Sequence, residues 1–313
     1  EGAYAMRIII TGGTGLIGRA LAADLADDNH EVIVLSRTPE RATGLPTGVR
    51  AERWDARTAE GWGALADGAD AIVNLAGESI AGAGLVPSRW TAERKRRIRE
   101  SRLNAGRAVV QAVELASSKP RVVVQASGVG YYGPRGDEEL TEEAPPGQDF
   151  MGRTAVEWEA STAPVESLGV RRAIIRSGAV LSTKGGAFPF MLLPFRLFVG
   201  GSLGSGRQWL PWIHISDQVR AIRFLTENEA ASGPFNLVAP DLLTNADFGR
   251  VLGRVMKRPA FVRVPAFALR LLFGEMSIVS LEGQKAIPRR LQESGFTFRF
   301  PEVEAALRDL VRK

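Results

Sequence analysis

The chain has 313 residues, of which 45% are hydrophobic, so it can bury the core of one large domain with a smaller lobe. It contains no cysteine and two histidines, which excludes a disulfide framework and leads us to expect no metal site. The formal net charge is +5, and whether this excess points to nucleic acid depends on where the cations lie.

The first predicted elements are an apolar strand and a glycine-rich turn that leads into a helix. Gly12 would permit the tight turn, and Gly15 would let the backbone approach a pyrophosphate. Gly18 would let the predicted helix Leu16–Asp27 pack closely on the strand, with the positive end of its dipole facing the anion. The pattern predicts a dinucleotide-binding turn. The alternative is a glycine-rich turn in another kind of α/β protein.

Strand-like and helix-like segments then alternate along the chain, which favours an α/β fold with a doubly wound parallel sheet of the Rossmann type. The strands are expected at residues 7–11, 31–35, 71–76, 121–126, 172–180 and 235–238. The helices between them are expected at residues 16–27, 59–66 and 91–116.

The composition changes after residue 181, where glycine, proline and aromatic residues become frequent, as in loops that build a substrate cleft. We therefore expect a Rossmann domain over residues 6–180, completed by part of 205–240, and a smaller lobe formed by residues 181–204 and 241–313. Residues 1–5 are expected to precede the natural start of the chain.

Amphipathic helices are expected in the smaller lobe at residues 248–256, 265–273 and 303–311. The apolar stretch 266–273 is interpreted as a packed helix and not as a membrane anchor. Residues 188–199 are too few to span a bilayer. The sequence therefore predicts a cytoplasmic protein without a membrane partner.

Cations crowd the predicted helix 91–116, and most of them are interpreted as a solvated helix face. They are Arg94, Lys95, Arg96, Arg97, Arg99 and Arg102. Nucleic-acid binding is the weaker alternative, because no stacking platform or nucleic-acid motif accompanies them. We expect a small-molecule substrate and no nucleic-acid partner.

The end of the second predicted strand indicates which cofactor would bind. No acid stands there, whereas Ser36 can donate to a 2′-phosphate and Arg37 can pair with it, so NADP fits better than NAD. Asp55, after the third strand, would accept from the adenine amino group or cap the next segment.

The segment after the fourth strand consists of Leu75, Ala76 and Gly77. Their small size would let the cofactor ribose lie against the backbone, or would serve close packing without a ligand.

Motifs along most of the chain resemble those of the atypical extended short-chain dehydrogenase/reductases. They are Thr11-Gly-Gly-Thr-Gly-Leu-Ile-Gly18, Asn74-Leu-Ala-Gly-Glu78, Ser101-Arg-Leu103, Gly130-Tyr-Tyr-Gly133, Trp158-Glu159, Arg176-Ser-Gly178 and Trp212-Ile-His-Ile-Ser-Asp217. More narrowly, they are similar to NADP-dependent epimerase-family proteins, also described as nucleoside-diphosphate-sugar epimerase-like. Residues 281–290 resemble the C-terminal domain of that subgroup.

The resemblance implies an extended Rossmann domain that holds NADP, with a smaller C-terminal substrate lobe. The cofactor-binding residues that we expect are Gly12, Gly13, Thr14, Gly15, Leu16, Ile17, Gly18, Ser36, Arg37, Asp55, Leu75, Ala76, Gly77, Arg102 and Val180. Arg102 would contact a phosphate or ribose, and Val180 would pass close to the nicotinamide through its backbone.

Short-chain dehydrogenases use a Tyr-x-x-x-Lys pair together with a serine or threonine. One alignment places Met151 and Ala155 at the pair, and a shift by one residue places Phe150 and Thr154 there, so neither restores it. The serine position falls on Gly128. Ser127, one residue earlier, and Tyr131 are therefore the catalytic candidates, although a structural role for a tyrosine of the pair 131–132 is the alternative.

The glycine-rich loop that ends at Trp209 lies where sugar-nucleotide relatives hold their substrate. Arg207 would clasp a phosphate or carboxylate, or would pair with an acid of the fold. Gln208, Trp209 and Trp212 would form a flat wall for a ring. His214 is expected to be structural, with Ser216 or Asp217 capping the next helix.

Together these features predict an NADP-dependent oxidoreductase or epimerase acting on a small or sugar-nucleotide-like substrate. A regulator that binds NADP(H) without catalysis, as the missing Tyr/Lys pair would favour, is the alternative. The sequence leaves the substrate, the reaction direction and the oligomeric state open.

Overall fold

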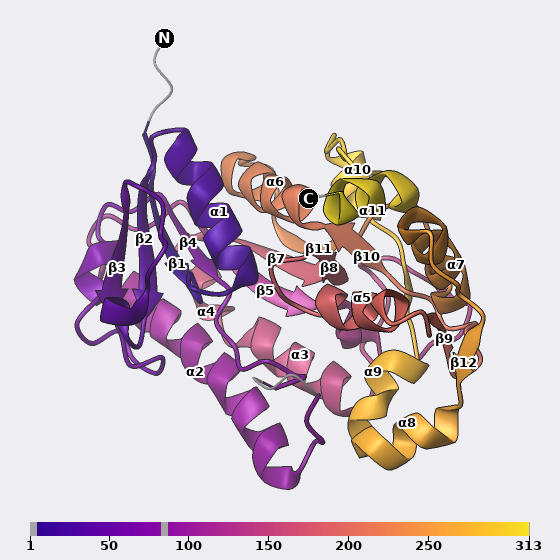
Figure 1. Cartoon of the computed structure of the whole chain (residues 1–313). Coiled ribbons are helices and arrows are strands. Elements are labelled where there is room, and N and C mark those ends of the chain that lie inside the picture. Colours follow the sequence, from indigo (N-terminus) through magenta and orange to yellow (C-terminus); the bar gives the residue numbers. More distant parts are fainter. Residues whose placement is uncertain (1–4, 83–86, 313) are drawn as a thin grey trace.

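A parallel sheet of seven strands forms the centre of the protein in the computed structural model, which describes residues 5–82 and 87–312 (Figure 1). Residues 1–4, expected to precede the natural start, lie outside the described residues. The strands, in sheet order, are β11 (Gly233–Leu237), β7 (Arg171–Ser177), β5 (Val122–Gly128), β4 (Ala71–Asn74), β1 (Arg7–Thr11), β2 (Glu31–Ser36) and β3 (Val49–Arg53). The strand order reverses between β1 and β4, so the carboxyl ends of these two strands border the crevice where ligands bind in such sheets.

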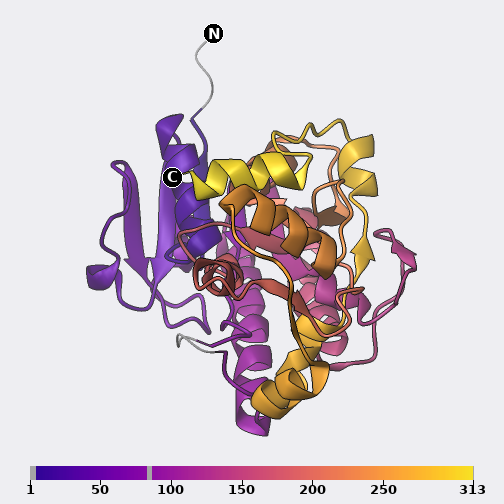
Figure 2. The same cartoon turned by 45° about the vertical axis from the view of Figure 1, so that its right-hand side comes forward.

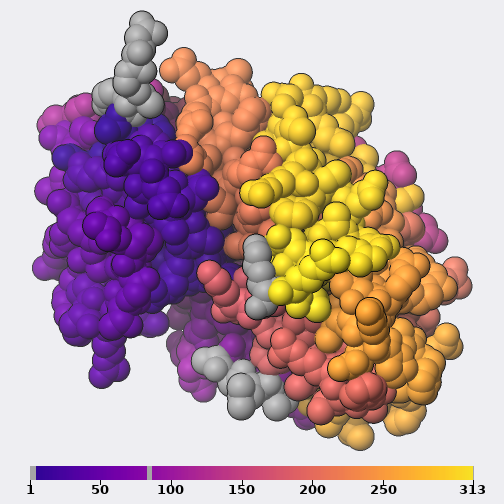
Figure 3. Space-filling model, turned by 45° about the horizontal axis from the view of Figure 1, so that its top comes forward, coloured from indigo at the N-terminus to yellow at the C-terminus, as the bar shows by residue number. Residues whose placement is uncertain are grey.

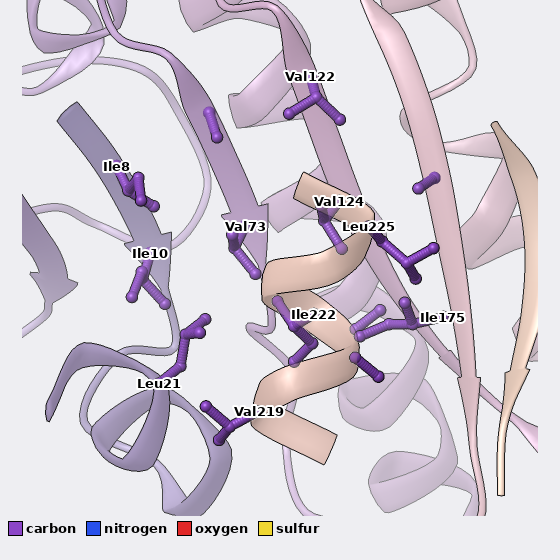
Figure 4. Packing of buried hydrophobic residues seen from close by; sticks show 14 of the residues in the cluster. Ile8, Ile10, Leu21, Val73, Val122, Val124, Ile175, Val219, Ile222 and Leu225 are labelled. Atoms are coloured by element: carbon purple, nitrogen blue, oxygen red, sulfur yellow. The ribbon is translucent and has the colours of Figure 1, made fainter. Parts of the chain in front are cut away.

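Alternate strand residues face opposite sides of the sheet and build two separate cores. Ile8 and Ile10 of β1 face the side covered by α1 (Leu16–Asp27) and α6 (Ile215–Glu227), as Figure 4 shows. Ile9 faces the other side, where α2 (Ala92–Leu115) lies. Because both faces of the sheet are buried, each strand is a continuous run of apolar residues, which is the pattern that predicted a doubly wound sheet. The parallel pairing of β1 with β2 and β4 confirms that prediction.

A polar row crosses the carboxyl end of the sheet just below the crevice. Thr11 lies beside Asn74, and Asn74 lies beside Gln125, in the register of β1, β4 and β5. The Thr11 hydroxyl donates to Asn74 Oδ1 (2.6 Å), and Asn74 Nδ2 donates to Gln125 Oε1 (2.8 Å). These buried side chains satisfy one another, so they hold the three strand ends level.

Two predicted elements differ from the structure. The expected strand 172–180 is broken at Gly178 into β7 and β8 (Ala179–Leu181), because β8 leaves the main sheet and pairs with β10 (Trp212–His214). A Cβ at Gly178 would lie 2.6 Å from the Pro211 carbonyl oxygen, so only glycine fits this crossing. The expected helix 59–66 shrinks to the 3-10 turn η2 (Gly63–Ala66).

The remaining elements flank the sheet or form the smaller lobe (Figures 1 and 2). Beside the sheet lie η1 (Pro39–Arg41), η3 (Val129–Tyr132), α3 (Phe150–Ala160), α4 (Pro164–Ser167), and the pair β6 (Glu139–Leu140) and β13 (Lys285–Ala286). The rest are α5 (Phe188–Arg196), α7 (Asn245–Met256), α8 (Ala266–Phe273), η4 (Gly274–Ser277), α9 (Ile278–Leu281), α10 (Arg289–Glu293), α11 (Val303–Val311), and the pair β9 (Gly201–Leu203) and β12 (Val262–Val264).

The lobe has a core of its own, built by one face each of α5, α7 and α11. Phe195 of α5, Phe248 of α7 and Leu307 of α11 are buried in it. The segment after α9 returns to the large sheet, where Leu291 and Phe296 join the core on the α1 side. The C-terminal part of the chain therefore contributes side chains to the core of the lobe and to the sheet core on the α1 side.

Helix α8 differs from the packed helix that the sequence predicts. Only Leu269 of this helix is buried, whereas Phe267 and Leu271 are each 71% exposed. Across residues 5–82 and 87–312, none of the helices has the length and apolar character needed to cross a bilayer.

Candidate active site

The turn between β1 and α1 has the geometry of a phosphate cradle. Gly12 adopts a φ of +66°, and a Cβ there would lie 2.9 Å from the carbonyl carbon of Leu75. A Cβ at Gly18 would lie 2.5 Å from the Gly12 carbonyl oxygen, so glycine lets α1 pack on the turn. A Cβ at Gly15 would meet only the Gly12 oxygen, at 3.2 Å, and the backbone at this residue faces open space.

The start of α1 leaves its first amide groups available to a ligand. Gly15 is the N-cap residue and has no side chain to accept from these N–H groups. A pyrophosphate placed at this turn would accept from them and would lie at the positive end of the helix dipole. The residues present therefore fit the phosphate groups of a dinucleotide.

Arg19, one turn into α1, fixes the shape of the cradle, and the sequence analysis did not select it. Its Nε donates to the Thr14 carbonyl (2.9 Å), and its NH1 donates to the Thr43 carbonyl (2.8 Å). The guanidinium thus joins the phosphate turn to the loop that follows β2. A lone arginine in a helix carries no sequence signal for such a role.

The end of β2 presents a free cation. Ser36 is buried, and its hydroxyl accepts from the Thr38 N–H (3.2 Å). The Arg37 carbonyl accepts from Arg53 NH1 (2.9 Å), whereas the Arg37 side chain is exposed and bonds to no other residue that the structure describes. An anion at this corner would therefore find an uncompensated guanidinium beside a serine hydroxyl.

Asp55 takes the capping role, the second of its two expected roles. Its Oδ1 accepts from the N–H groups of Arg57 (2.7 Å) and Thr58 (2.8 Å), and its Oδ2 accepts from the Thr58 hydroxyl (2.9 Å). Burial acts to raise the pKa of Asp55, but these donors together hold it below its ordinary value. The carboxylate is thus engaged by the segment that it caps.

The segment after β4 is clamped by the basic helix α2. Gly77 lies against Arg102, since a Cβ there would come within 3.2 Å of the guanidinium carbon. Arg102 NH1 donates to the carbonyls of Glu78 and Ile98 (2.9 Å each), and the guanidinium stacks 4.7 Å from the ring centre of Trp158. Burial lowers the pKa of Arg102 to about 10, although the charge of Glu78 opposes this shift.

The solvated face that we expected for most of these cations is found at Arg96, Arg97 and Arg99, which are exposed, but not at the buried Arg94 and Arg102. Arg94 is buried and donates to the Ser79 carbonyl (2.7 Å), and its NH1 lies 3.5 Å from Glu78 Oε1. Arg97 pairs with the same oxygen at 3.5 Å. Arg94 and Arg102 therefore hold the loop after β4 through its carbonyl groups, which a sequence cannot reveal before the loop is placed.

A buried ion pair lies at the opposite end of the crevice. The Ser127 hydroxyl, at the end of β5, donates to Glu159 Oε1 (2.7 Å). Arg176 of β7 grips both oxygens of Glu159, at 2.8 and 2.9 Å. Although burial works against it, the hydrogen bonds and charge of Glu159 hold the pKa of Arg176 above its ordinary value. The Ser127 hydroxyl therefore donates its one proton to the buried Glu159 carboxylate.

The two neighbouring tyrosines play different parts. The Tyr132 hydroxyl donates to Asn236 Oδ1 (2.6 Å) and accepts from Arg176 NH1 (3.2 Å), and burial raises its pKa to about 12. The Tyr131 ring lies flat on the Arg176 guanidinium, 3.4 Å from ring centre to Cζ. Tyr132 is structural, and Tyr131 keeps a hydroxyl that no residue of the described chain engages.

Helix α3 carries no proton-transfer pair on the face that meets β5 and η3. Met151 lies over Gly130, whose added Cβ would be 3.3 Å away, and Ala155 is buried. Glu159, one turn further, is the group that holds Ser127. Glu159 and Arg176 lie within the family motifs, but no role was predicted for either residue, although an arginine inside an apolar strand indicates a buried partner.

A cavity of about 830 Å³ extends from the glycine turn along α1 towards α6 and α11. Thr14, Gly15 and Leu16 line one end, and the loop 182–186 closes over them, with Gly186 near the Leu16 side chain. Val180 precedes this loop in β8, so the segment expected to pass the nicotinamide adjoins the cradle. Figure 3 shows the seam between the indigo N-terminal part and the yellow C-terminal part, where α1 faces α11.

Comparison with known proteins decides the family. The profile of the NAD dependent epimerase/dehydratase family matches residues 8–237. The chain belongs to this family. A domain of unknown function, DUF1731, matches residues 264–310. The family predicted from the motifs is thus confirmed, including its C-terminal part.

Relatives match along almost the whole chain. Epimerase family protein YfhF of Bacillus subtilis (strain 168) is 38% identical over 316 residues and covers 98% of each chain. Epimerase family protein SDR39U1 of Mus musculus is 39% identical over 314 residues, covering 98% of this chain and 100% of the mouse protein.

Solved structures of the family have the same fold. The crystal structure of human epimerase family protein SDR39U1 (isoform 2) with NADPH is 36% identical, with a TM-score of 0.87 over 98% of this chain and 100% of that chain. A nucleoside-diphosphate sugar epimerase from Corynebacterium glutamicum is 33% identical, with a TM-score of 0.76 over 98% of this chain and 58% of that chain. The family and the first of these structures support a nicotinamide cofactor.

The residues expected to bind substrate in this family member line a second cavity, of about 350 Å³. Arg207 lies at its rim, exposed, and none of the described acids pairs with it. Trp209 donates to Asp137 Oδ1 (2.8 Å), which fixes its ring at the wall. Gln208 also lines the cavity, and its Nε2 donates to the carbonyls of Leu203 and Ser280 (2.9 and 2.8 Å). Trp212 is fully buried and its Nε1 donates to the Asp241 carbonyl (2.9 Å), so the expected wall does not include it.

His214 has a structural role, as expected, but the residues that we expected to cap α6 do not do so. The His214 Nδ1 accepts from the Ser216 N–H (3.1 Å), so the histidine itself is the N-cap. Asp217 is fully buried and accepts from the N–H groups of Arg299 and Phe300 (2.8 Å each). It therefore ties α6 to the C-terminal segment.

Proposed function

We propose that the protein binds NADP(H) across the carboxyl ends of β1, β2 and β4 and is an oxidoreductase or epimerase. The observation that carries the proposal is the pairing of an open glycine cradle at Gly15 with an uncompensated Arg37 beside Ser36. No carboxylate stands at this strand end to favour the ribose hydroxyls of NAD. The NADPH in the human family member supports the same choice.

A nicotinamide cofactor bound here supplies or accepts a hydride, and the side chains at the end of β5 set what else the site can do. Because Ser127 donates its proton to Glu159, its oxygen can only accept a hydrogen bond from a substrate hydroxyl. Tyr131 is the hydroxyl left to exchange a proton with the substrate oxygen, and its ring is held against the Arg176 guanidinium. We propose Ser127 as the orienting group and Tyr131 as the acid/base.

We propose the second cavity as the place for the remainder of a small or sugar-nucleotide-like substrate. Arg207 offers two parallel N–H donors to an anionic group, and Trp209 offers a flat wall to a ring. A substrate with both features would use the unpaired cation and the fixed indole together.

A regulator that binds NADP(H) without turnover is the second candidate. Met151 and Ala155 on α3 favour it, because they leave the site without the lysine that lowers the pKa of a catalytic tyrosine. A Tyr131→Phe variant separates the two candidates. Loss in this variant of NADPH oxidation with carbonyl compounds, or of epimerisation of sugar nucleotides with NADP, supports the enzyme, whereas the absence of both activities from the parent protein supports the regulator.

The cofactor proposal is tested by titrating NADPH and NADH against the parent protein and an Arg37→Ala variant by calorimetry. We expect the parent to prefer NADPH, and the variant to lose about ten- to a hundredfold in NADPH affinity with NADH unchanged, because one charge-assisted contact is worth about 1.5 to 3 kcal/mol. Arg107→Ala, at an exposed cation of α2, is the matched control. Equal affinity of the parent for both cofactors would refute the choice of NADP.

A further inference from the structure

The exposed large apolar side chains are concentrated on one part of the smaller lobe. All of those that the structure describes, except Leu115, Val156 and Val279, lie in two segments, 190–199 and 261–272. We call this surface the lobe patch. Its members are Phe190, Leu193, Leu197, Phe198, Val199, Phe261, Phe267, Leu271 and Leu272.

The two segments of the lobe patch meet in space. Strand β12 pairs with β9, and the Val262 N–H donates to the Gly200 carbonyl (3.1 Å). Phe261 is therefore next to the end of the loop 197–199. The Arg258 guanidinium lies 4.3 Å from the ring centre of Phe198, which joins the segments again. Figure 3 shows both segments, salmon and orange, side by side at the lower right.

The patch is not the outer side of ordinary amphipathic helices. The inner face of α5 buries Phe188, Leu192 and Phe195, while Phe190 and Leu193 cover its outer face. Phe261 is 81% exposed at the start of β12. A helix that is apolar all round is normally buried, and a contiguous exposed apolar surface marks a docking site.

The polar residues of the lobe patch carry one sign of charge. No aspartate or glutamate occurs in residues 167–216 or in residues 248–274. The cations on or beside the patch are Arg196, Lys257, Arg258, Arg263 and Arg270. Within residues 5–82 and 87–312, none of these five forms an ion pair with a carboxylate. The surface is thus apolar and positively charged at once.

The backbone at Phe198 provides an independent indication of function. This residue has a φ of +63°, a conformation that a bulky side chain rarely adopts. The result is that an aromatic ring is held at the surface of the patch. Strain of this kind persists where the surrounding structure imposes it, and it gathers at binding sites.

We propose that the lobe patch docks on the surface of a bilayer that contains anionic lipids. Phenylalanine and leucine side chains enter the boundary between headgroups and acyl chains, and arginine and lysine beside them pair with lipid phosphates. A second copy of the chain is a poor occupant, because a symmetric dimer through this patch would bring cations against cations. The proposal departs from the absence of a membrane partner that we expected from the sequence.

The test is sedimentation of the whole chain with vesicles at physiological salt. We expect the protein to pellet with vesicles of phosphatidylcholine and phosphatidylglycerol, to stay in the supernatant with phosphatidylcholine alone, and to be released by high salt. The alternative of an acidic partner protein predicts no pelleting with either vesicle. That outcome would overturn the proposal.

Two sets of variants separate the contributions. The pair Lys257→Gln and Arg263→Gln should weaken binding about 25-fold, since each cation near an anionic surface strengthens binding about fivefold. The pair Phe198→Asn and Phe261→Gln should weaken it at least tenfold, and asparagine tolerates the backbone at 198. Leu115→Gln and Arg107→Gln, on α2, are the matched controls.

Circular dichroism and NADPH titration establish that each variant is folded. Loss of vesicle binding in both patch variants, with both controls unchanged, supports the proposal. Equal loss in patch and control variants would refute it. A concentration-dependent dimer that the Phe198→Asn and Phe261→Gln pair abolishes, without vesicle binding by the parent, would also refute it and assign the patch to a second copy.

Discussion

The two ends of the crevice are built for different purposes. At the β1–β2 end the backbone is open at Gly15, and the Arg37 cation has no partner among the described residues. At the β5–β7 end, Ser127, Glu159 and Arg176 satisfy one another in the interior. The first end keeps its donors for a ligand, whereas the second end uses them to hold the fold together.

This difference explains why the cofactor site is better defined than the chemistry. A ligand site needs polar groups that lack partners before the ligand arrives. A buried ion pair, by contrast, loses most when one member is removed, because the remaining charge cannot reach water. Substitutions at the two ends should therefore separate affinity from stability, in the following order of expected size.

The largest effect is expected at the β5–β7 end. Glu159→Ala leaves the Arg176 guanidinium buried without its carboxylate and should lower the free energy of unfolding by about 3 to 5 kcal/mol. Urea unfolding followed by circular dichroism measures it. Glu166→Ala is the control, because Glu166 is half exposed in its pair with Arg172 and should cost less than about 1 kcal/mol. Equal losses would contradict the buried-pair interpretation.

Two glycines of the cradle should respond in opposite ways. Gly18→Ala drives a Cβ into the Gly12 carbonyl and should cost about 1 to 3 kcal/mol of stability. Gly15→Ala has room on its ligand side, so stability should change little while NADPH affinity falls. Thermal unfolding and cofactor titration of both variants check this. A stable Gly18→Ala variant would show that helix packing does not require the glycine.

Tyr132 should make stability depend on alkaline pH. Burial raises the pKa of Tyr132 in the folded protein to about 12 from its ordinary value of 10.0, so its contribution is complete below pH 10 and is lost as the pH rises through 12. At pH 8, Tyr132→Phe should be about 1 to 2 kcal/mol less stable than the parent, from two lost hydrogen bonds. Urea titrations between pH 8 and 12 should show this gap closing. A constant gap would mean that burial does not perturb the phenol.

The smallest effect is expected at Asp55. Because its carboxylate caps the segment at Arg57 and Thr58, Asp55→Ala should cost less than about 1 kcal/mol and leave NADPH affinity unchanged. Its pKa is lowered from 3.8, so the contribution is present above that value and disappears as the pH falls below it. A marked loss of NADPH affinity would instead support the contact between Asp55 and the adenine amino group that was the first of its two expected roles.

The sequence predicts the elements with strong periodicity well. Helix α1 has the expected bounds, and α2 begins and ends within one residue of its expected limits, because apolar spacing and capping residues are local properties. The break at Gly178 escaped prediction, since its cause is a carbonyl at Pro211, far along the chain. A strand that changes partner midway still reads as one apolar run.

The glycine turn of the candidate site could be predicted from the sequence, whereas the two arginines that hold the loop after β4 could not. The positions of Gly12, Gly15 and Gly18 follow from backbone requirements that the sequence displays directly. The burial of Arg94 and Arg102 depends on where the loop after β4 lies, which no spacing in α2 encodes. A row of cations on a helix therefore does not predict how exposed those side chains are until the neighbouring segments are placed.

The return of the C-terminal segment to the large sheet limits how this protein can be divided. Leu291 and Phe296 lie in the core beside β11, Arg290 donates to the Pro234 carbonyl (2.6 Å), and Asn236 donates to the Ile287 carbonyl (2.9 Å). A gene truncated after residue 263 would encode a sheet whose outer strand lacks its cover. The tail matched by the domain of unknown function therefore packs against the large sheet and is bonded to its outer strand. Because it completes the core of the other half, we do not expect it to fold as an independent module.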